Sequence, residues 1–193
     1  MALTQKPPRS KKCRNRDCGK TFVPVRSMQS VCSPACGLAY AAKQREQKEA
    51  RGKRDERKSI RVALEKAKTR STHLKELQVA FNQWIRLRDA GQPCIACGRH
   101  HQGQLHAGHY RSVGSCPELR FEPDNCHLSC QPCNVHLSGN LIPYRINLVK
   151  KIGLARVEWI EGYHEPKKYT MTEILEMKAF YRSEVRRMKK VAA

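Results

Sequence analysis

Residues 94–134 decide the fold, because CIAC (94–97), LHAGHY (105–110) and EPDNCHLSCQPCN (122–134) follow one another within them. The first and last of these segments each contain a Cys-x-x-Cys pair. Two such pairs are typical of a tetrahedral zinc site with four thiolate ligands, here Cys94, Cys97, Cys130 and Cys133. Four thiolates leave zinc no open position for water, so we predict a structural ion. A thioredoxin-like redox pair is disfavoured, because no βαβ pattern surrounds these cysteines.

The polar residues between the two cysteine pairs indicate phosphodiester chemistry. Their order resembles the pattern of HNH (ββα-metal) nucleases, with a histidine on a first strand, an asparagine in the connecting loop and a ligand after the second pair. On that resemblance His109 is the general base, Asn125 braces the loop so that the base is aimed correctly, and Asn134 binds the catalytic ion. A neutral imidazole suits deprotonation of water near pH 7. Oxygen-rich ligation suits Mg²⁺ or Mn²⁺, which stabilises the charge that gathers on the phosphate.

The position before His109 departs from the commonest HNH form, in which an acidic residue or a histidine there binds the metal. Here that residue is Gly108, which has no side chain. We expect His106 to supply the missing ligand, although residues three apart on a regular strand face opposite sides. A bulge at Gly108 would be needed to bring the two histidines together. One alternative exchanges the roles of the two histidines. The rival ligands are His136, Asp124 and Glu118.

A second set of four cysteines lies near the N-terminus, at Cys13, Cys18, Cys32 and Cys36. Two cysteine turns separated by a short hairpin are typical of a zinc ribbon or treble clef, and Pro34 suits the first turn of a helix. We predict a zinc module that contacts nucleic acid; the alternative is a staple that only anchors the next helix. Residues 1–12 are polar and basic and are expected to form a disordered arm.

The other histidines and cysteines have simpler predictions. We expect His73, His100, His101 and His164 to be solvated. His127 could replace a cysteine at zinc, but the four-cysteine set is complete without it. Cys116 and Cys126 lie outside both sets and are predicted to be buried thiols.

From residue 38 to about 88 the composition predicts helix, since the segment is rich in Ala, Lys, Arg, Glu and Gln and contains no proline. Residues 43–58 include almost no apolar side chain, so this part is either a solvated linker or a helix that follows phosphates. Further on, an apolar stripe predicts an amphipathic helix that packs on another element. The stripe consists of Leu74, Leu77, Phe81, Trp84 and Ile85. In the tail we expect a short helix at 144–151, a turn at Gly153, and a helix from an N-cap at Thr172 to residue 190.

The net charge is +21, from 38 Lys and Arg residues against 17 Asp and Glu residues. Such a field attracts polyanions, and nucleic acid is the leading partner because phosphates neutralised by Lys and Arg release counterions. A membrane surface is disfavoured as a partner, because no segment is both basic and strongly apolar on one face. No run approaches the roughly 18 apolar residues that a membrane span needs. The N-terminal segment has no apolar core typical of a signal peptide, so we predict a cytoplasmic protein. The candidate nucleic-acid contacts are Lys11, Lys12, Arg14, Arg16, Lys53, Arg54, Arg57, Lys58 and Arg111.

The combination of HAGHY, FEPDNCHLSCQPCN and SGNLIPYR resembles the NinG (Rap) recombination proteins of lambdoid phages over essentially the whole chain. That resemblance implies a structure-specific endonuclease that nicks branched DNA, such as D-loops and Holliday junctions, in the cytoplasm of the host cell. It also suggests host recombination proteins as partners. Symmetric resolution of a junction would favour a homodimer, for which the face from Leu74 to Ile85 is a candidate.

Together these observations predict an α+β protein in three parts. These are a basic arm with a zinc module (1–40), a charged and then amphipathic helical region (41–88), and an HNH-like nuclease domain with a helical tail (89–193). The predicted activity is that of a DNA endonuclease with two structural zinc ions and one catalytic Mg²⁺ or Mn²⁺. The alternatives are a non-catalytic zinc protein that binds DNA or RNA, and an RNA-directed nuclease. The second alternative is weakly supported, because aromatic residues for base stacking are sparse.

Overall fold

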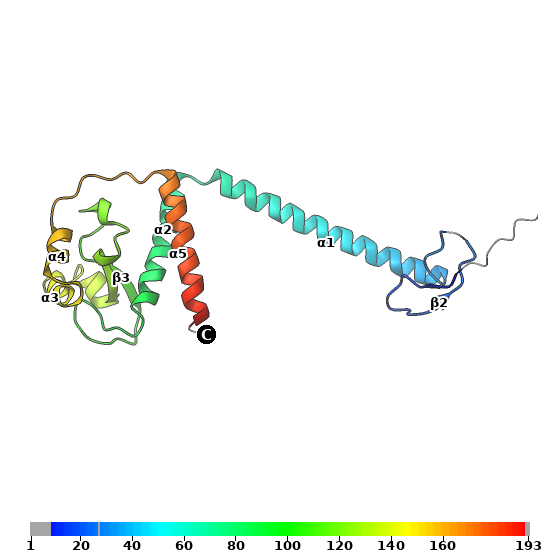
Figure 1. Cartoon of the computed structure of the whole chain (residues 1–193), viewed down its shortest axis with the longest axis horizontal. Helices are drawn as coiled ribbons and strands as arrows, with labels where there is room; N and C mark the ends of the chain where they lie inside the picture. Colours follow the sequence, from blue (N-terminus) through cyan, green and yellow to red (C-terminus); the bar gives the residue numbers. More distant parts are fainter. Residues whose placement is uncertain (1–8, 27, 192–193) are drawn as a thin grey trace, which may run out of the picture. The chain divides into compact units, whose positions relative to one another are not determined.

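The computed structural model describes residues 9–26 and 28–191, and it divides between residues 67 and 68 into two compact units. The middle segment predicted at 41–88 is therefore split between the units, and residues 1–8 of the predicted arm lie outside the described residues. Helices and two small antiparallel sheets make up the described part, which confirms the α+β class (Figure 1). No helix in this part is long and apolar enough to cross a membrane.

The first unit consists of a short hairpin followed by a long helix. Strand β1 (Lys11–Lys12) pairs antiparallel with β2 (Thr21–Phe22). These strands flank the first cysteine turn, so the prediction that a hairpin separates the two cysteine turns is wrong. The chain returns at Gly19, whose positive φ of 64° favours glycine. Helix α1 (Pro34–Ala67) begins at the proline as predicted, and its charged composition leaves it no residue to bury.

The single helix predicted from residue 38 to 88 is interrupted at Lys68 and Thr69. Helix α2 (Arg70–Arg88) has its own N-cap, because Thr69 is extended (φ −76°, ψ 161°) and its side chain accepts a hydrogen bond from the Thr72 amide. Threonine is a preferred N-cap, since its hydroxyl satisfies an amide of the first turn that has no partner within the helix. The prediction of one continuous helix is therefore wrong. The helix-favouring composition on both sides of Thr69 gave no sign of this single capping residue.

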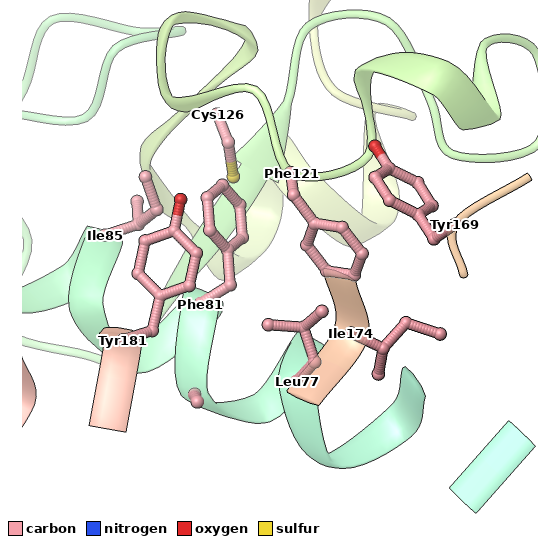
Figure 2. Packing of buried hydrophobic residues seen from close by; sticks show 9 residues of the cluster. Leu77, Phe81, Ile85, Phe121, Cys126, Tyr169, Ile174 and Tyr181 are labelled. Carbon is pink, nitrogen blue, oxygen red and sulfur yellow. The ribbon is translucent and has the colours of Figure 1, made fainter. Parts of the chain in front are cut away.

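Helix α2 packs against the C-terminal helix α5 (Met171–Val191) and against strand β3 (Leu105–His109). The Phe81 ring lies at the centre of their core, 5.7 Å from Phe121 and 5.1 Å from Tyr181 between ring centroids. The predicted amphipathic stripe is confirmed, but this chain covers it. The face is therefore not the dimer interface that we predicted for it. Figure 2 shows the core residues, which include Leu77, Phe81, Ile85, Phe121, Cys126, Tyr169, Ile174 and Tyr181.

The second sheet carries the region that the cysteine pairs enclose. Strand β3 pairs antiparallel with β4 (Cys126–Cys130), and the connection contains the helical turns η1 (Pro117–Leu119) and η2 (Pro123–Asn125). Strand β4 is followed closely by η3 (Pro132–His136), a π-helical turn. Helices α3 (Leu141–Ile152) and α4 (Leu154–Glu161) complete a second core around the cysteine pairs, to which Tyr144, Leu148 and Val157 contribute.

The tail differs from its prediction in three places. Helix α3 begins three residues earlier than expected, and α4 was not predicted at all. The N-cap of α5 is Thr170 and not Thr172. The Glu173 amide donates to Thr170 Oγ1, and the Thr170 amide donates back to Glu173 Oε2 at 2.7 Å. This reciprocal pair is a capping box, which fixes where the helix starts.

His73 is buried, so the prediction that it is solvated is wrong. Lys178 Nζ of α5 donates to His73 Nδ1 at 2.7 Å and to Glu76 Oε2 at 3.1 Å. The cluster joins α2 to α5 through polar groups that would be costly to bury alone. His164 is half-buried, with its ring 4.6 Å from that of Trp159, whereas His100 is exposed as predicted.

Candidate functional site

The cysteine set within residues 94–133 is arranged as a metal site would require. The sulfur atoms of Cys94, Cys97, Cys130 and Cys133 lie within 4.8 Å of one another. The Cys130 amide donates to Cys94 Sγ at 3.3 Å, and Asn140 Nδ2 donates to Cys133 Sγ at 3.6 Å. Burial alone raises the pKa of Cys94, but backbone amides led by that of Cys130 outweigh it and lower the pKa to about 7. These donors favour the thiolate form, so the cluster is compatible with a structural zinc ion.

The N-terminal cysteine set has the same character. The sulfur atoms of Cys13, Cys18, Cys32 and Cys36 also lie within 4.8 Å of one another. Cys18 Sγ and Cys32 Sγ are 3.5 Å apart, and Cys32 Sγ and Cys36 Sγ are 3.6 Å apart. Zn–S bonds of about 2.3 Å in a tetrahedron place sulfur atoms about 3.8 Å apart. This cluster too is compatible with structural zinc, and all ten cysteines of the chain are free.

His101 lies beside the cluster that contains Cys97 and is only half-buried. Its Nε2 is 3.2 Å from Cys97 Sγ, although we expected this histidine to be solvated. A ring N–H donated to a ligand sulfur stabilises the thiolate, as outer-shell partners of metal ligands commonly do.

Asn125 is fully buried in the connection between β3 and β4. Its Nδ2 donates to the carbonyl oxygens of Arg111 at 3.0 Å and Leu119 at 3.2 Å, and its Oδ1 accepts from the Arg111 amide at 2.8 Å. The Tyr110 amide donates to the Asn125 carbonyl oxygen at 2.8 Å. The side chain thus ties the chain after β3 to η1, which is the bracing geometry expected for this residue.

Strand β3 keeps a regular register with β4 along its whole length, from Leu105 opposite Cys130 to His109 opposite Cys126. The bulge that would bring His106 and His109 together is therefore missing from β3. Because side chains alternate along a strand, His106 shares a face with Gly108, and His109 lies on the opposite face. The expectation that both histidines point into one site is wrong.

Asn134, on η3, packs over Gly108. A Cβ at Gly108 would lie 2.8 Å from Asn134 Oδ1 and 3.0 Å from Ser129 Cβ, so the absence of a side chain lets the asparagine approach. Asn134 Nδ2 lies 3.4 Å from His106 Nδ1. His106 Nε2 is buried and has no hydrogen-bond partner among the described residues. A buried ring nitrogen without a partner is unusual, and it marks this corner as a place where a ligand could bind.

His109 occupies a different environment. Its Nε2 donates to the Arg120 carbonyl oxygen at 2.9 Å, and its Nδ1 lies 3.7 Å from Cys126 Sγ. Burial lowers the pKa of His109 below its ordinary value, so the ring is neutral at pH 7. With the hydrogen on Nε2, Nδ1 is the nitrogen that can accept a proton. The residue also lines a hollow of about 400 Å³ together with Arg111 and Ser138.

Known proteins similar to this chain identify its family. The family model described as Bacteriophage Lambda NinG protein matches residues 5–191. The chain belongs to the NinG family. Protein ninG of Salmonella phage P22 is 36% identical over 190 residues, which cover 91% of this chain and 92% of that protein. Protein ninG of Escherichia phage lambda is 36% identical over 193 residues, which cover 93% of each. No solved structure matches the chain. The NinG resemblance expected from the sequence motifs is confirmed.

In this NinG-family chain the rival metal ligands are not gathered around Asn134. Asp124 Oδ2 accepts from Arg156 Nε at 2.8 Å, and the Cys116 thiol donates to Glu118 Oε1 at 3.1 Å. His136 is exposed. Of the predicted ligands, the structure thus brings His106 to Asn134 and leaves Asp124 and Glu118 with other partners.

His127 is fixed by partners other than cysteine. Arg88 Nη2 donates to His127 Nδ1 at 2.9 Å, and His127 Nε2 donates to the Asp124 carbonyl oxygen at 3.0 Å. Both ring nitrogens are occupied, so this residue is not a substitute zinc ligand. Cys116 and Cys126 are fully buried, as predicted, and burial raises the pKa of both thiols.

The predicted nucleic-acid contacts lie in both units. The exposed members are Lys11, Lys12, Arg14, Arg16, Lys53, Arg54, Arg57 and Lys58. Arg14 and Arg16 line a hollow of about 250 Å³ with Tyr40 and Lys43. Arg111 differs from these, because its Nη1 donates to the carbonyl oxygens of Ile160 at 3.1 Å and Gly162 at 2.8 Å. These bonds satisfy carbonyl groups at the C-terminal end of α4, so Arg111 has a structural role.

Two residues of α2 that the sequence did not single out border the Asn134 corner. Asn82 and Arg86 line a hollow of about 480 Å³ with His106 and Asn134. Their positions, one helical turn apart and next to the buried stripe, were the only signal available in the sequence.

Proposed function

We propose that this protein is a metal-dependent DNA endonuclease of the HNH type. The observation that carries the proposal is the contact of Asn134 with Gly108 beside His106. Two antiparallel strands, a braced connection and a following helical turn bring these residues together. This order of strand, strand and helical turn beside a four-cysteine cluster supports the resemblance to the ββα-metal arrangement.

The hollow beside Asn134 fits a divalent cation. The Asn134 amide offers an oxygen, and His106 offers a ring nitrogen that no described residue occupies. Both donors are neutral, so water and a substrate phosphate would complete the ligand set of Mg²⁺ or Mn²⁺. When bound, such an ion stabilises the negative charge that gathers on the phosphate during hydrolysis. The packing of Asn134 on Gly108 would hold the amide in one orientation.

Two histidines are candidates for the general base, and they lie on opposite faces of β3. His109 matches the HNH base by its spacing from Asn125 and Asn134, is neutral at pH 7, and is held in one tautomer by the Arg120 carbonyl. His106 shares the hollow with Asn134. Substitution distinguishes them: a lost base costs rate at every metal concentration, whereas a lost ligand weakens metal binding and is compensated by more metal.

DNA is the proposed substrate. A net charge of +21 and exposed basic side chains in both units suit the neutralisation of several phosphates at once. The preference for D-loops and Holliday junctions, and the host cytoplasm as the setting, rest on the NinG resemblance. Several basic elements in one chain raise the effective concentration where duplex arms meet, which agrees with a branched substrate.

The test is nicking of a labelled four-way junction and its matched linear duplex with Mg²⁺, Mn²⁺ or EDTA. We compare the wild type with His109→Ala, His106→Ala and Asn134→Ala, and use His100→Ala, an exposed histidine, as the control. We expect metal-dependent cutting of the junction, unchanged in the control. Asn134→Ala should recover part of its activity as metal is added, and the base variant should stay inactive while it still binds the junction.

The second candidate function is that of a non-catalytic zinc protein that binds nucleic acid. Helix α1 favours it, because this helix buries no residue and exposes Lys53, Arg54, Arg57 and Lys58. Such a helix suits contact with a phosphate backbone. If the zinc-loaded wild type binds both DNAs tightly and cuts neither with any metal, this function replaces the nuclease.

A further inference from the structure

The hollow beside Asn134 has a wall that comes from helix α2. Asn82 and Arg86 line it from the helix, and His106 and Asn134 line it from β3 and η3. The two helix residues are four positions apart, so they lie on one face and directly follow the buried Phe81 and Ile85. Burial of that stripe against the core thus turns Asn82 and Arg86 towards the hollow.

The end of α2 is held firmly to the strand that precedes η3. Arg88 Nη2 donates to the Cys126 carbonyl oxygen at 2.8 Å, and the Leu128 amide donates to Asp89 Oδ2 at 3.0 Å. Asp89 is buried, with 3% of its surface exposed. These contacts lie within one helical turn of Arg86, so its backbone is fixed relative to the sheet that carries His106.

Within the described part of the chain the Arg86 side chain has no partner, whereas those of the other two arginines of α2, Arg70 and Arg88, each have one. Arg88 pairs with Asp89 at 2.8 Å, and Arg120 Nε donates to Gln78 Oε1 at 2.7 Å. Arg86 is exposed and makes no hydrogen bond or ion pair within the described part of the chain. The described residues that line the hollow include no carboxylate that could neutralise it. Its guanidinium is therefore available to an anion.

We propose that Arg86 binds a non-bridging oxygen of the scissile phosphate and stabilises the charge that develops there in the transition state. The inference rests on the proposed nuclease function. In the step concerned, the oxygen of the attacking water forms a bond to phosphorus, and its proton passes to the general base, for which His106 is the candidate that lines the same hollow. The bond from phosphorus to the 3′ oxygen breaks, and that oxygen takes up a proton from solvent. The non-bridging oxygens carry more negative charge at this point than in the ground state, and a planar guanidinium can donate two N–H groups to them.

The role is specific to arginine and to this position. Lysine would place a single charge but could not form two parallel hydrogen bonds. Loss of a positioned donor to a developing oxyanion typically costs about 10²- to 10³-fold in rate. We therefore expect Arg86→Ala to lower the nicking rate about 100-fold and Arg86→Lys to recover part of the loss. Lys75→Ala, at an exposed position three turns earlier on α2, is the matched control and should keep the wild-type rate.

The experiment measures single-turnover nicking at saturating enzyme, with the dissociation constant of the junction determined in parallel in EDTA. A second substrate carries a methylphosphonate at the cleaved position, which replaces one charged non-bridging oxygen by a methyl group. We expect Arg86→Ala to change the dissociation constant less than threefold. Relative to the wild type, its nicking rate should fall on the phosphodiester but change little on the methylphosphonate. Thermal melting of the variant should match the wild type, because the side chain is exposed.

Four outcomes would contradict the proposal or its basis. An equal rate loss on both substrates would overturn the proposal, because the arginine would then not act through the phosphate oxygen. A higher dissociation constant with an unchanged rate would also overturn it, since Arg86 would then only contact the DNA backbone. A wild type that cuts neither substrate would refute the nuclease function itself, whereas a wild type that cuts and an equally active Arg86→Ala would refute only the role of Arg86.

Discussion

Gly108→Ala tests the candidate site with a single methyl group. The φ of Gly108 lies outside the left-handed region, so alanine brings no backbone strain and the effect comes from space alone. The new Cβ would lie 2.8 Å from Asn134 Oδ1 and 3.0 Å from Ser129 Cβ. Ser129 is 1% exposed and must shift by a few tenths of an ångström, and the closer Asn134 oxygen must move further.

The size of the effect follows from these distances. Ordinary contact of a Cβ begins near 3.4 Å, so the amide oxygen must retreat by about 0.6 Å, the difference between 3.4 and 2.8 Å. Overpacking of this kind costs about 1–3 kcal/mol, which lowers the melting temperature by a few degrees. A misplacement of about 1 Å at a reacting centre can cost about 100-fold in rate. We therefore expect nicking to fall about 10- to 100-fold while most of the protein stays folded.

The assay pairs single-turnover nicking with thermal melting of the same preparation. Gly103→Ala is the matched control, since nothing lies within 4 Å of its added Cβ, and it should change neither quantity. In the double variant Gly108→Ala, Asn134→Ser, the amide that meets the new methyl group is gone. The melting temperature should therefore return to the wild-type value, whereas nicking should stay low. Wild-type nicking by Gly108→Ala, with a melting temperature that shows the methyl group is accommodated, would refute the placement of Asn134 at the metal.

Three further predictions concern the supports of the site. Asn125→Ala leaves buried backbone groups without partners, each costing about 1–3 kcal/mol, and should lower the free energy of unfolding in urea by about 2–5 kcal/mol; a loss below about 1 kcal/mol would contradict the bracing role. Cys97→Ala should reduce bound zinc from two ions per chain to one in elemental analysis, whereas Cys116→Ser, outside both clusters, should keep two. The Lys68 ammonium lowers the pKa of Glu76 to about 2, so the stability from this pairing is complete above the ordinary value of 4.5 and is lost as pH falls towards 2. Glu76→Gln should remove that part of the pH dependence from urea midpoints between pH 5 and 2, and an unchanged profile would contradict it.

The sequence predicted what depends on short spacings. The four-cysteine sets follow from pairs of ligands that are near neighbours in the chain, and tetrahedral chemistry leaves them few other uses. The stripe from Leu74 to Ile85 follows from helical periodicity. The bracing hydrogen bonds of Asn125 agree with the expected task, because a buried amide in a loop must find backbone partners.

What the sequence could not predict depends on contacts between distant segments. The stripe of α2 signalled burial, but its cover is α5, about a hundred residues later, and no local pattern distinguishes that helix from a second copy of the chain. His73 looked like a solvated residue for the same reason, since its partner is Lys178. The break at Thr69 was missed because one capping threonine barely changes the average helix propensity of its surroundings.

The missing acidic ligand before His109 and the approach of Asn134 have one cause. Any side chain at position 108 would begin 2.8 Å from the Asn134 oxygen, so a carboxylate there and this asparagine position exclude each other. Among the described residues that line the hollow, neither candidate donor, Asn134 or His106, is a carboxylate, and Arg86 is the only charged side chain. Neutral donors leave the full charge of a divalent ion to act on the phosphate, and they also hold the ion less tightly without substrate. Under the proposed function, a substrate phosphate would complete the metal site and attract Arg86 at the same time, so DNA binding would assemble the charges that hydrolysis needs.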